Sequence, residues 1–238
     1  MIKAIIFDFD GTISNRQMNA YTIFDDYVKD IFKDMTKMEY EAMLQDFLTD
    51  DCNGTINCKY RLAPFINKYK DYLPENFEDD FIAFYYEYMW KYCVLKPETR
   101  DVLTKLKGKY KMAILSNGQS KSQHDKIDYM NINEFFDEIV VSGDIGINKP
   151  NKEIFEIMAD RLGVKPEECM FVGDVFSSDI LGAIRANMLP VWIKVDTERP
   201  HKYYDGLIIN NLNELFDILA KENSWKNPII IDLEHYLR

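Results

Sequence analysis

A short apolar run near the start of the chain, followed at once by two carboxylates, constrains the fold more than any other stretch. Residues 4–7 (Ala-Ile-Ile-Phe) show no helical period, as expected for a strand covered on both faces of a parallel sheet. Asp8 and Asp10 follow two residues apart, so in an extended segment their side chains project to the same side. Gly11 provides the turn by which the chain leaves the sheet. The stretch predicts a buried strand ending in two acidic groups, although an Asp-Gly turn after a strand is common in any protein.

The composition of the 238 residues is that of a globular protein, with 47% hydrophobic residues and no low-complexity segment or internal repeat. No apolar segment approaches the length of a membrane span, and the first apolar run is too short for a signal peptide because Asp8 interrupts it. We therefore expect a cytoplasmic protein without a membrane partner.

The formal net charge of −11 argues against a nucleic-acid polymer as partner, because such binding needs a basic surface. A small anionic ligand would need a local exception to this negative field. Four cysteines, Cys52, Cys58, Cys93 and Cys169, lack a metal-type spacing, and the three histidines do not cluster with them. We expect reduced, structural thiols.

Residues 14–92 are predicted to be helical throughout and to form an inserted domain. In residues 77–92, an apolar and aromatic stripe with helical spacing is most simply a packed core. A second interpretation has an aromatic side chain stack on a ligand ring, the candidates being Tyr85, Tyr86, Tyr88 and Trp90. Lys59 and Arg61 are candidate cations of this domain for ligand binding, and a solvated helix face explains them equally well.

After Pro97 the pattern changes to alternating helices and strands, which indicates a doubly wound α/β fold with a mostly parallel sheet. The predicted organisation is an α/β core of residues 1–13 and 93–222, the helical domain 14–92, and a C-terminal extension 223–238. Residues 228–232 of the extension could add an edge strand or meet a partner. Further strands are expected at 111–115, 138–142, 168–173, 190–195 and 207–210, with helices at 102–106, 122–130 and 152–162.

Three of the predicted strands end in polar residues: Asp8 and Asp10 follow the first, Ser116 and Asn117 the second, and Asp174 a third. The carboxyl ends of parallel strands form the edge where open α/β sheets bind ligands. Carboxylates without a neighbouring thiolate or imidazole suit a hard cation such as Mg²⁺. Asp8, Asp10, Asp174 and Asp179 are the predicted metal site.

Donors and positive charge accompany this acidic cluster. Ser116, Asn117, their neighbouring backbone N–H groups and Lys149 suit a phosphoryl group, which accepts hydrogen bonds and carries negative charge. The expected ligand is therefore a small phosphorylated metabolite.

Four motifs in this order resemble those of the haloacid dehalogenase-like superfamily of phosphohydrolases, in which a helical cap domain is inserted after the first strand. The resemblance spans residues 1–21 and 93–220, and residues 14–92 stand where the cap belongs. The motifs are Asp8-Phe-Asp-Gly-Thr12, Ser116-Asn-Gly118, Lys149-Pro150 and Gly173-Asp-Val-Phe-Ser-Ser-Asp179.

The resemblance implies a Mg²⁺-dependent phosphatase acting through an aspartyl phosphate, with Asp8 as nucleophile and Asp10 as general acid and base. It also implies that Ser116 binds phosphate and that Lys149 stabilises charge. The implied metal ligands are Asp8, the backbone carbonyl of Asp10, Asp174 and Asp179. One departure is Ser178, where the family often has Asn; it bears on how Asp179 is held and not on the chemistry.

Other functions with the same scaffold are a metal-independent dehalogenase, a sugar-phosphate mutase and a catalytically silent binding module. The dehalogenase lacks the second carboxylate, such mutases usually carry a histidine early in the cap where residues 14–92 have none, and a silent module would have lost a core residue. Residues 146–155 and 174–187, with the short stretch 53–56, are similar to the pyrimidine 5′-nucleotidase-like branch. Nucleoside 5′-monophosphates are therefore candidate substrates beside small phosphomonoesters in general, and the sequence leaves the oligomeric state open.

Overall fold

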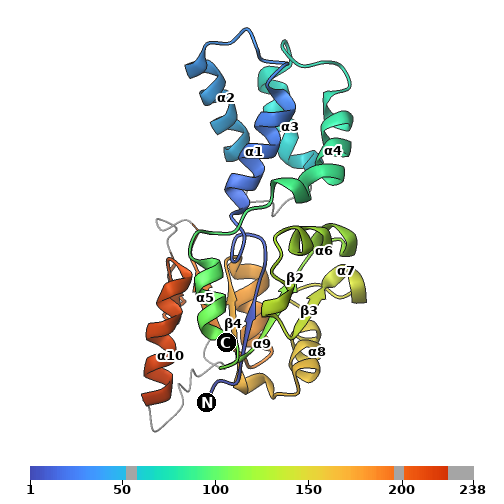
Figure 1. Ribbon diagram of the computed structural model, residues 1–238. Helices are drawn as coiled ribbons and strands as arrows, with labels where there is room; N and C mark the ends of the chain where they lie inside the picture. The colour runs from blue at the N-terminus through green and yellow to red at the C-terminus, as the bar shows by residue number, and fades with distance from the viewer. Residues whose placement is uncertain (52–57, 196–200, 225–238) are drawn as a thin grey trace. The chain divides into compact units, whose positions relative to one another are not determined.

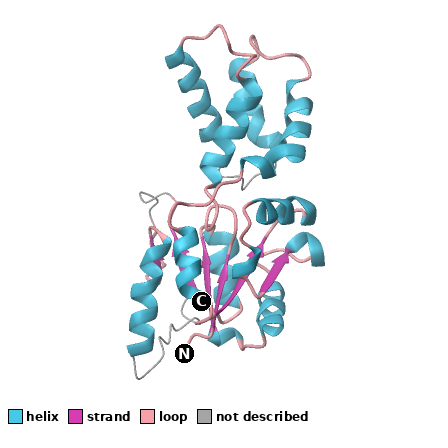
Figure 2. Ribbon diagram, viewed as in Figure 1, coloured by secondary structure: helices cyan, strands magenta, loops and turns pink. Residues whose placement is uncertain are grey.

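A computed structural model of the chain describes residues 1–51, 58–195 and 201–224. The chain divides into two compact units, one of residues 1–14 with 95–238 and one of residues 15–94. Figure 1 shows the chain coloured by residue number, and Figure 2 shows it coloured by secondary structure.

The first unit is built on a six-stranded sheet in the order β3-β2-β1-β4-β5-β6, and every pair of neighbouring strands is parallel. Figure 2 shows the strands in magenta between flanking helices. The sheet confirms the predicted doubly wound α/β fold. The strands are β1 (Ala4–Phe7), β2 (Lys111–Ser116), β3 (Glu138–Val141), β4 (Cys169–Gly173), β5 (Leu189–Ile193) and β6 (Leu207–Ile209).

Helices cover both faces of this sheet because alternate side chains of the buried strands point to opposite sides. One face, with Ala4, Ile6 and Phe171, packs against α8 and α9 in a single buried cluster. On another part of the unit, α5 lies beside α10 (Figure 1). The ammonium of Lys105 on α5 stands over the ring of Phe216 on α10. The helices of the unit are α5 (Thr99–Leu106), α6 (Ser120–Tyr129), α7 (Ser142–Ile145), α8 (Lys152–Leu162), α9 (Leu181–Arg185) and α10 (Leu215–Ser224).

The position of β1 between β2 and β4 decides where the polar residues meet. In the register of the sheet, Phe7 is paired with Ile114 on one side and with Val172 on the other. Asp8 therefore leaves the sheet beside the ends of both neighbours, at the edge to which the sequence assigned the site.

The structure differs from the prediction after β3. The strand ends at Val141, and Ser142 begins the one-turn helix α7 where the sequence indicated a loop. The Asp144 carboxylate accepts a hydrogen bond from the Val141 N–H at 3.2 Å, and Gly146 ends the turn with φ of 73°. A turn of this length has too few residues to show a helical period in the sequence.

The second unit is helical, as its sequence pattern predicts. Its core is aromatic: Phe24 is fully buried and stacks on Phe47 with ring centroids 3.6 Å apart, while the rings of Phe65 and Phe81 lie perpendicular to the Phe24 ring. The stripe predicted from residues 77–92 thus packs as core. The helices are α1 (Arg16–Val28), α2 (Lys37–Asp50), α3 (Cys58–Tyr69), α4 (Phe77–Tyr88) and a 3-10 helix (Met89–Tyr92).

Two of the four cysteines, Cys93 and Cys169, have described side chains and are buried thiols. Cys52, the stretch 53–56 and residues 225–238 with the proposed edge strand lie outside the described residues. Among the described helices, none is long and apolar enough to cross a membrane.

Replacing Phe24 by alanine should destabilise the helical unit by about 3–5 kcal/mol, because the change removes the ring at the centre of its aromatic core. Urea unfolding followed by circular dichroism measures the loss. Tyr60→Ala on α3, where the side chain is exposed, is the matched control and should cost less than about 0.5 kcal/mol. A Phe24→Ala loss as small as that of the control would contradict the described core.

Candidate active site

The centre of the site is the side chain of Lys149, which joins two carboxylates from different motifs. Its ammonium lies 2.6 Å from Asp8 Oδ1 and 2.8 Å from Asp179 Oδ1, and its side chain is only 1% exposed. Asp8 follows β1, and Asp179 lies in the π-helical turn Phe176–Ile180 after β4. The ion pairs therefore fix the relative positions of three segments that are remote in sequence.

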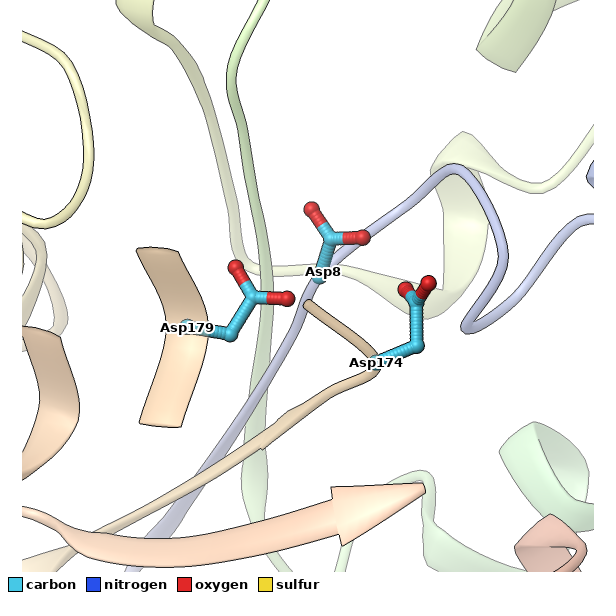
Figure 3. Close-up of side chains that lie close together, drawn as sticks. All are labelled: Asp8, Asp174 and Asp179. Atoms are coloured by element: carbon cyan, nitrogen blue, oxygen red, sulfur yellow. The ribbon is translucent and has the colours of Figure 1, made fainter. Parts of the chain in front are cut away.

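A third carboxylate, Asp174, completes a buried acidic cluster. One oxygen each from Asp8, Asp174 and Asp179 can be chosen so that all lie within 4.8 Å of one another, and Figure 3 shows the three side chains gathered around one space. Asp174 accepts a hydrogen bond from Thr12 Oγ1 at 3.0 Å, and its backbone carbonyl accepts one from Trp192 Nε1 at 3.0 Å. The cluster is thus held by both side-chain and backbone contacts.

Two glycines permit the close approach of these segments. A Cβ on Gly11, whose φ is 91°, would stand 2.5 Å from the Asp174 carboxylate, and a Cβ on Gly173 would stand 2.6 Å from the Asp179 carboxylate. Contacts so short are not tolerated, and a positive φ disfavours other residue types at position 11. The glycines of the first and last motifs are therefore steric requirements of the acidic cluster.

Besides its ion pair with Lys149, the Asp179 carboxylate accepts two hydrogen bonds, and one of them comes from Ser178, where the family often has Asn. Asp179 accepts hydrogen bonds from the Val175 N–H at 2.9 Å and from Ser178 Oγ at 3.1 Å. The short Ser178 side chain thus supports the carboxylate directly.

Burial and repulsion between the carboxylates raise the pKa values of two acids in the cluster. Burial, opposed by Lys149 and reinforced by Asp179 and Asp10, raises the pKa of Asp8 to about 6. Burial and the charges of Asp8 and Asp179 raise the pKa of Asp174 well above its usual range. Burial alone would lower the pKa of Lys149, but the charges of Asp179 and Asp8 outweigh it and raise that pKa above its ordinary value.

The donor set suits a hard divalent cation. Three buried carboxylates lie together, Lys149 pairs with two of them, and burial with their mutual repulsion raises the pKa values of Asp8 and Asp174. Oxygen ligands without sulfur or nitrogen are what Mg²⁺ prefers. The residues present therefore fit the predicted magnesium ion.

The second motif contributes to the site in two ways. Ser116 ends β2 with its side chain buried, and its hydroxyl donates to the Asn117 carbonyl at 3.4 Å. The Asn117 side chain donates to the Lys149 carbonyl at 3.0 Å and accepts from the Lys149 N–H at 2.9 Å. In this structure the Asn117 amide therefore holds the backbone that carries Lys149, a role that the sequence alone did not indicate.

Two further residues reach the predicted general acid and base. Lys126 Nζ lies 2.6 Å from Asp10 Oδ2, and Gln123 Nε2 donates to the same oxygen at 2.9 Å and to Ser116 Oγ at 2.8 Å. Both come from α6 and were not singled out in the sequence. Their spacing of three residues, which places them on one face of a helix, was the available signal.

In the helical unit, Arg61 is buried rather than solvated. Its guanidinium pairs with Asp51 and lies 5.8 Å from the centre of the Tyr85 ring, and Arg16 pairs with the same carboxylate at 3.0 Å. Lys59 is exposed on α3. Arg61 and Tyr85, two of the candidate ligand residues, thus contact one another in a charged cluster of this unit.

Similarity to known proteins agrees with the fold and the motifs. The sequence profile of haloacid dehalogenase-like hydrolases matches residues 2–187, which is most of the chain. The chain therefore belongs to the haloacid dehalogenase-like hydrolases and is an enzyme of that family.

Two individual proteins and one solved structure are similar to this chain. The chain is 27% identical to the glyceraldehyde 3-phosphate phosphatase of Pyrococcus furiosus, over 93% of this chain and 95% of that protein. It is 31% identical to the pyrimidine 5′-nucleotidase YjjG of Escherichia coli, over 56% of this chain and 60% of that protein. A solved structure of the putative hydrolase YfnB of Bacillus subtilis, bound to magnesium, superposes with a TM-score of 0.74 at 23% identity, covering 92% of this chain and 98% of that one.

In the presence of a chelator, replacing Asp8 by asparagine should change the pH dependence of stability. Because the pKa of Asp8 is raised in the folded protein, its contribution is fully present below the ordinary aspartate pKa and is lost as the pH rises through about 6. Between pH 4 and 7.5 the difference in unfolding free energy should move in favour of Asp8→Asn by about 2 kcal/mol.

Denaturant unfolding of both proteins across this pH range measures the difference. Asp160→Asn, at an exposed carboxylate on α8, is the control and should show no such trend. An Asp8→Asn difference that stays constant with pH would contradict the described burial of the cluster.

Proposed function

We propose that this chain is a phosphatase that hydrolyses small phosphomonoesters through an aspartyl phosphate at Asp8. The observation that carries the proposal is a buried Asp8 held by Lys149 beside two further carboxylates, with Asp10 two residues further on. A carboxylate fixed at the end of a strand, with balancing positive charge and a neighbouring acid, is arranged for nucleophilic attack and proton transfer.

In the first step a carboxylate oxygen of Asp8 forms a bond to phosphorus, and the bond from phosphorus to the ester oxygen breaks. Asp10 gives its proton to the departing oxygen, which leaves as an alcohol. Lys149, bonded to Asp8 Oδ1, orients the nucleophile and offsets the negative charge that gathers on the phosphoryl group. Ser116 supplies a donor for one phosphoryl oxygen.

In the second step a water oxygen attacks phosphorus, and Asp10 takes up the proton of that water. The bond between phosphorus and the Asp8 oxygen breaks, so that the carboxylate is restored and inorganic phosphate leaves. Asp10 thus returns to its protonated form, and the cycle is balanced in protons.

Mg²⁺ would be held by Asp8, Asp174, Asp179 and the backbone carbonyl of Asp10. When bound, it draws the phosphate oxygens and the carboxylates together in spite of their like charge. The magnesium bound to the similar Bacillus subtilis hydrolase supports this proposal.

The proposed substrate class is small phosphorylated metabolites, with triose phosphates and nucleoside 5′-monophosphates as the two classes to compare. The similarity to the Pyrococcus phosphatase extends over 93% of the chain and so includes the helical unit, whereas the similarity to the Escherichia coli nucleotidase covers 56%. This difference favours a small sugar or triose phosphate over a nucleotide.

The helical unit is proposed to act as the cap that selects the leaving group, because the core carries the phosphoryl chemistry. The buried pair of Arg61 and Tyr85, with Lys59 nearby in sequence, is the part of this unit that we propose influences substrate choice. A panel of phosphomonoesters with the wild-type protein and Arg61→Met compares the two substrate classes directly.

Asp8→Asn should reduce turnover of every phosphomonoester to background, because the amide is a poor nucleophile and removes one carboxylate of the metal site. Release of inorganic phosphate by the purified, folded variant is the measurement, with Asp160→Asn as the control that keeps wild-type activity. Residual activity within about tenfold of wild type, a barrier difference of only about 1.4 kcal/mol, would rule out Asp8 as the nucleophile.

Activity should be lost on chelation and should return with added Mg²⁺, because the acidic cluster needs a cation to accept a dianionic phosphate. The measurement is the rate of phosphate release at three stages: before chelation, after dialysis against chelator, and after readdition of Mg²⁺. Undiminished hydrolysis by the chelated protein would show that the metal proposal is wrong.

A further inference from the structure

Lys126 is a buried lysine that the proposed phosphatase mechanism does not use. Its side chain is 3% exposed, and its ammonium is bonded to Asp10 Oδ2 and lies 5.4 Å from the centre of the Phe9 ring. A lysine is rarely buried so completely unless a charged partner holds it there. Transfer of the ammonium out of water costs several kcal/mol, so the ion pair with Asp10 is weak evidence for a role in stabilising the fold. This raises the question of a functional role for the pair.

Gln123 is a second buried residue of α6 that bonds to Asp10. It lies one turn before Lys126 on α6, is 4% exposed, and its Nε2 reaches both Asp10 Oδ2 and Ser116 Oγ. A single amide therefore links the proposed acid to the proposed phosphate donor. Gly118 allows this approach, because a Cβ at that position would meet the Gln123 side chain at 2.9 Å.

We propose that Lys126 and Gln123 are positioning residues that orient the Asp10 carboxyl group for proton transfer to the leaving oxygen. This inference rests on the proposed function, in which Asp10 is the general acid. An ammonium and an amide nitrogen can only donate hydrogen bonds, so Oδ2 is the oxygen that they hold.

The other oxygen, Oδ1, accepts a longer bond of 3.4 Å from Ser14 Oγ. Oδ2 already accepts from both Lys126 and Gln123, so a proton on Oδ2 would displace one of these two donors. The geometry therefore assigns proton transfer to Oδ1, with Oδ2 as the fixed end of the carboxyl group.

A misoriented acid has a characteristic effect on different esters. An alkoxide is a poor leaving group and needs a proton as its bond to phosphorus breaks, whereas 4-nitrophenolate leaves without one. General acid catalysis contributes about 10²–10⁴-fold where it is needed. Loss of a positioning residue should therefore slow alkyl phosphates and spare an activated aryl phosphate, while general damage would slow both.

The test compares Lys126→Met with wild type on glycerol phosphate and on 4-nitrophenyl phosphate in the presence of Mg²⁺. The quantity to measure is kcat/KM, which includes the first bond cleavage and excludes hydrolysis of the phosphoenzyme. We expect kcat/KM to fall at least about thirtyfold for the alkyl ester and less than about threefold for the aryl ester. Gln123→Met should change the same ratio in the same direction.

Two further variants serve as controls. Lys126→Arg keeps a buried cation and should recover part of the alkyl ester activity. Lys121→Met removes a lysine of the same helix whose side chain is 87% exposed and should leave both esters at wild-type rates. Equal losses on both esters in Lys126→Met, or no loss on either, would overturn the positioning role.

Asp10→Asn separates this inference from the function on which it rests. If Asp10→Asn leaves alkyl ester hydrolysis intact, the proposed acid is wrong and the proposed mechanism fails with it. If Asp10→Asn slows the alkyl ester strongly while Lys126→Met does not change the ratio, the mechanism stands and only the positioning role is lost.

Discussion

The structure of the site depends on one interaction, the double ion pair of Lys149 with Asp8 and Asp179. Three carboxylates lie together in a buried space, where loss of water and, after it, their mutual repulsion raise the pKa of Asp8 and Asp174. Lys149 offsets part of the charge and so allows Asp8 to lie close to two other carboxylates. The proposed Mg²⁺ would complete this charge balance before a phosphate approaches.

The parallel sheet makes this arrangement possible because it gathers segments that are far apart in sequence. Placing β1 between β2 and β4 brings Asp8, Ser116 and Asp174 to one edge. The contacts around them divide into two groups. One group, centred on Lys149, holds the acidic cluster, and the other, centred on Lys126 and Gln123, holds Asp10. Asp8, the proposed nucleophile, and Asp10, the proposed acid, are thus held by separate lysines.

The sequence predicted the sheet and the motif residues because each buried strand ends abruptly at polar residues, so that the change in polarity marks both structure and site. Lys126 and Gln123 were not predicted as site residues, because the polar face of a helix such as α6 is normally solvated. Only the fold shows that these two side chains bond to Asp10. Asn117 was expected at the phosphate but bonds to the Lys149 backbone, a contact that depends on loop geometry. The roles of the site residues, and of residues 14–92 as a cap, stay predictions.

The most direct test of the account is to identify the phosphorylated residue during turnover. Mixing the Mg²⁺-loaded enzyme with a radiolabelled phosphomonoester and quenching in acid should leave label on the protein, and peptide mapping should place it on the peptide that contains Asp8. The label should disappear on treatment with hydroxylamine, which cleaves acyl phosphates. Label on a serine or histidine, or rapid turnover with no labelled protein at any quench time, would contradict the central claim that Asp8 is the nucleophile.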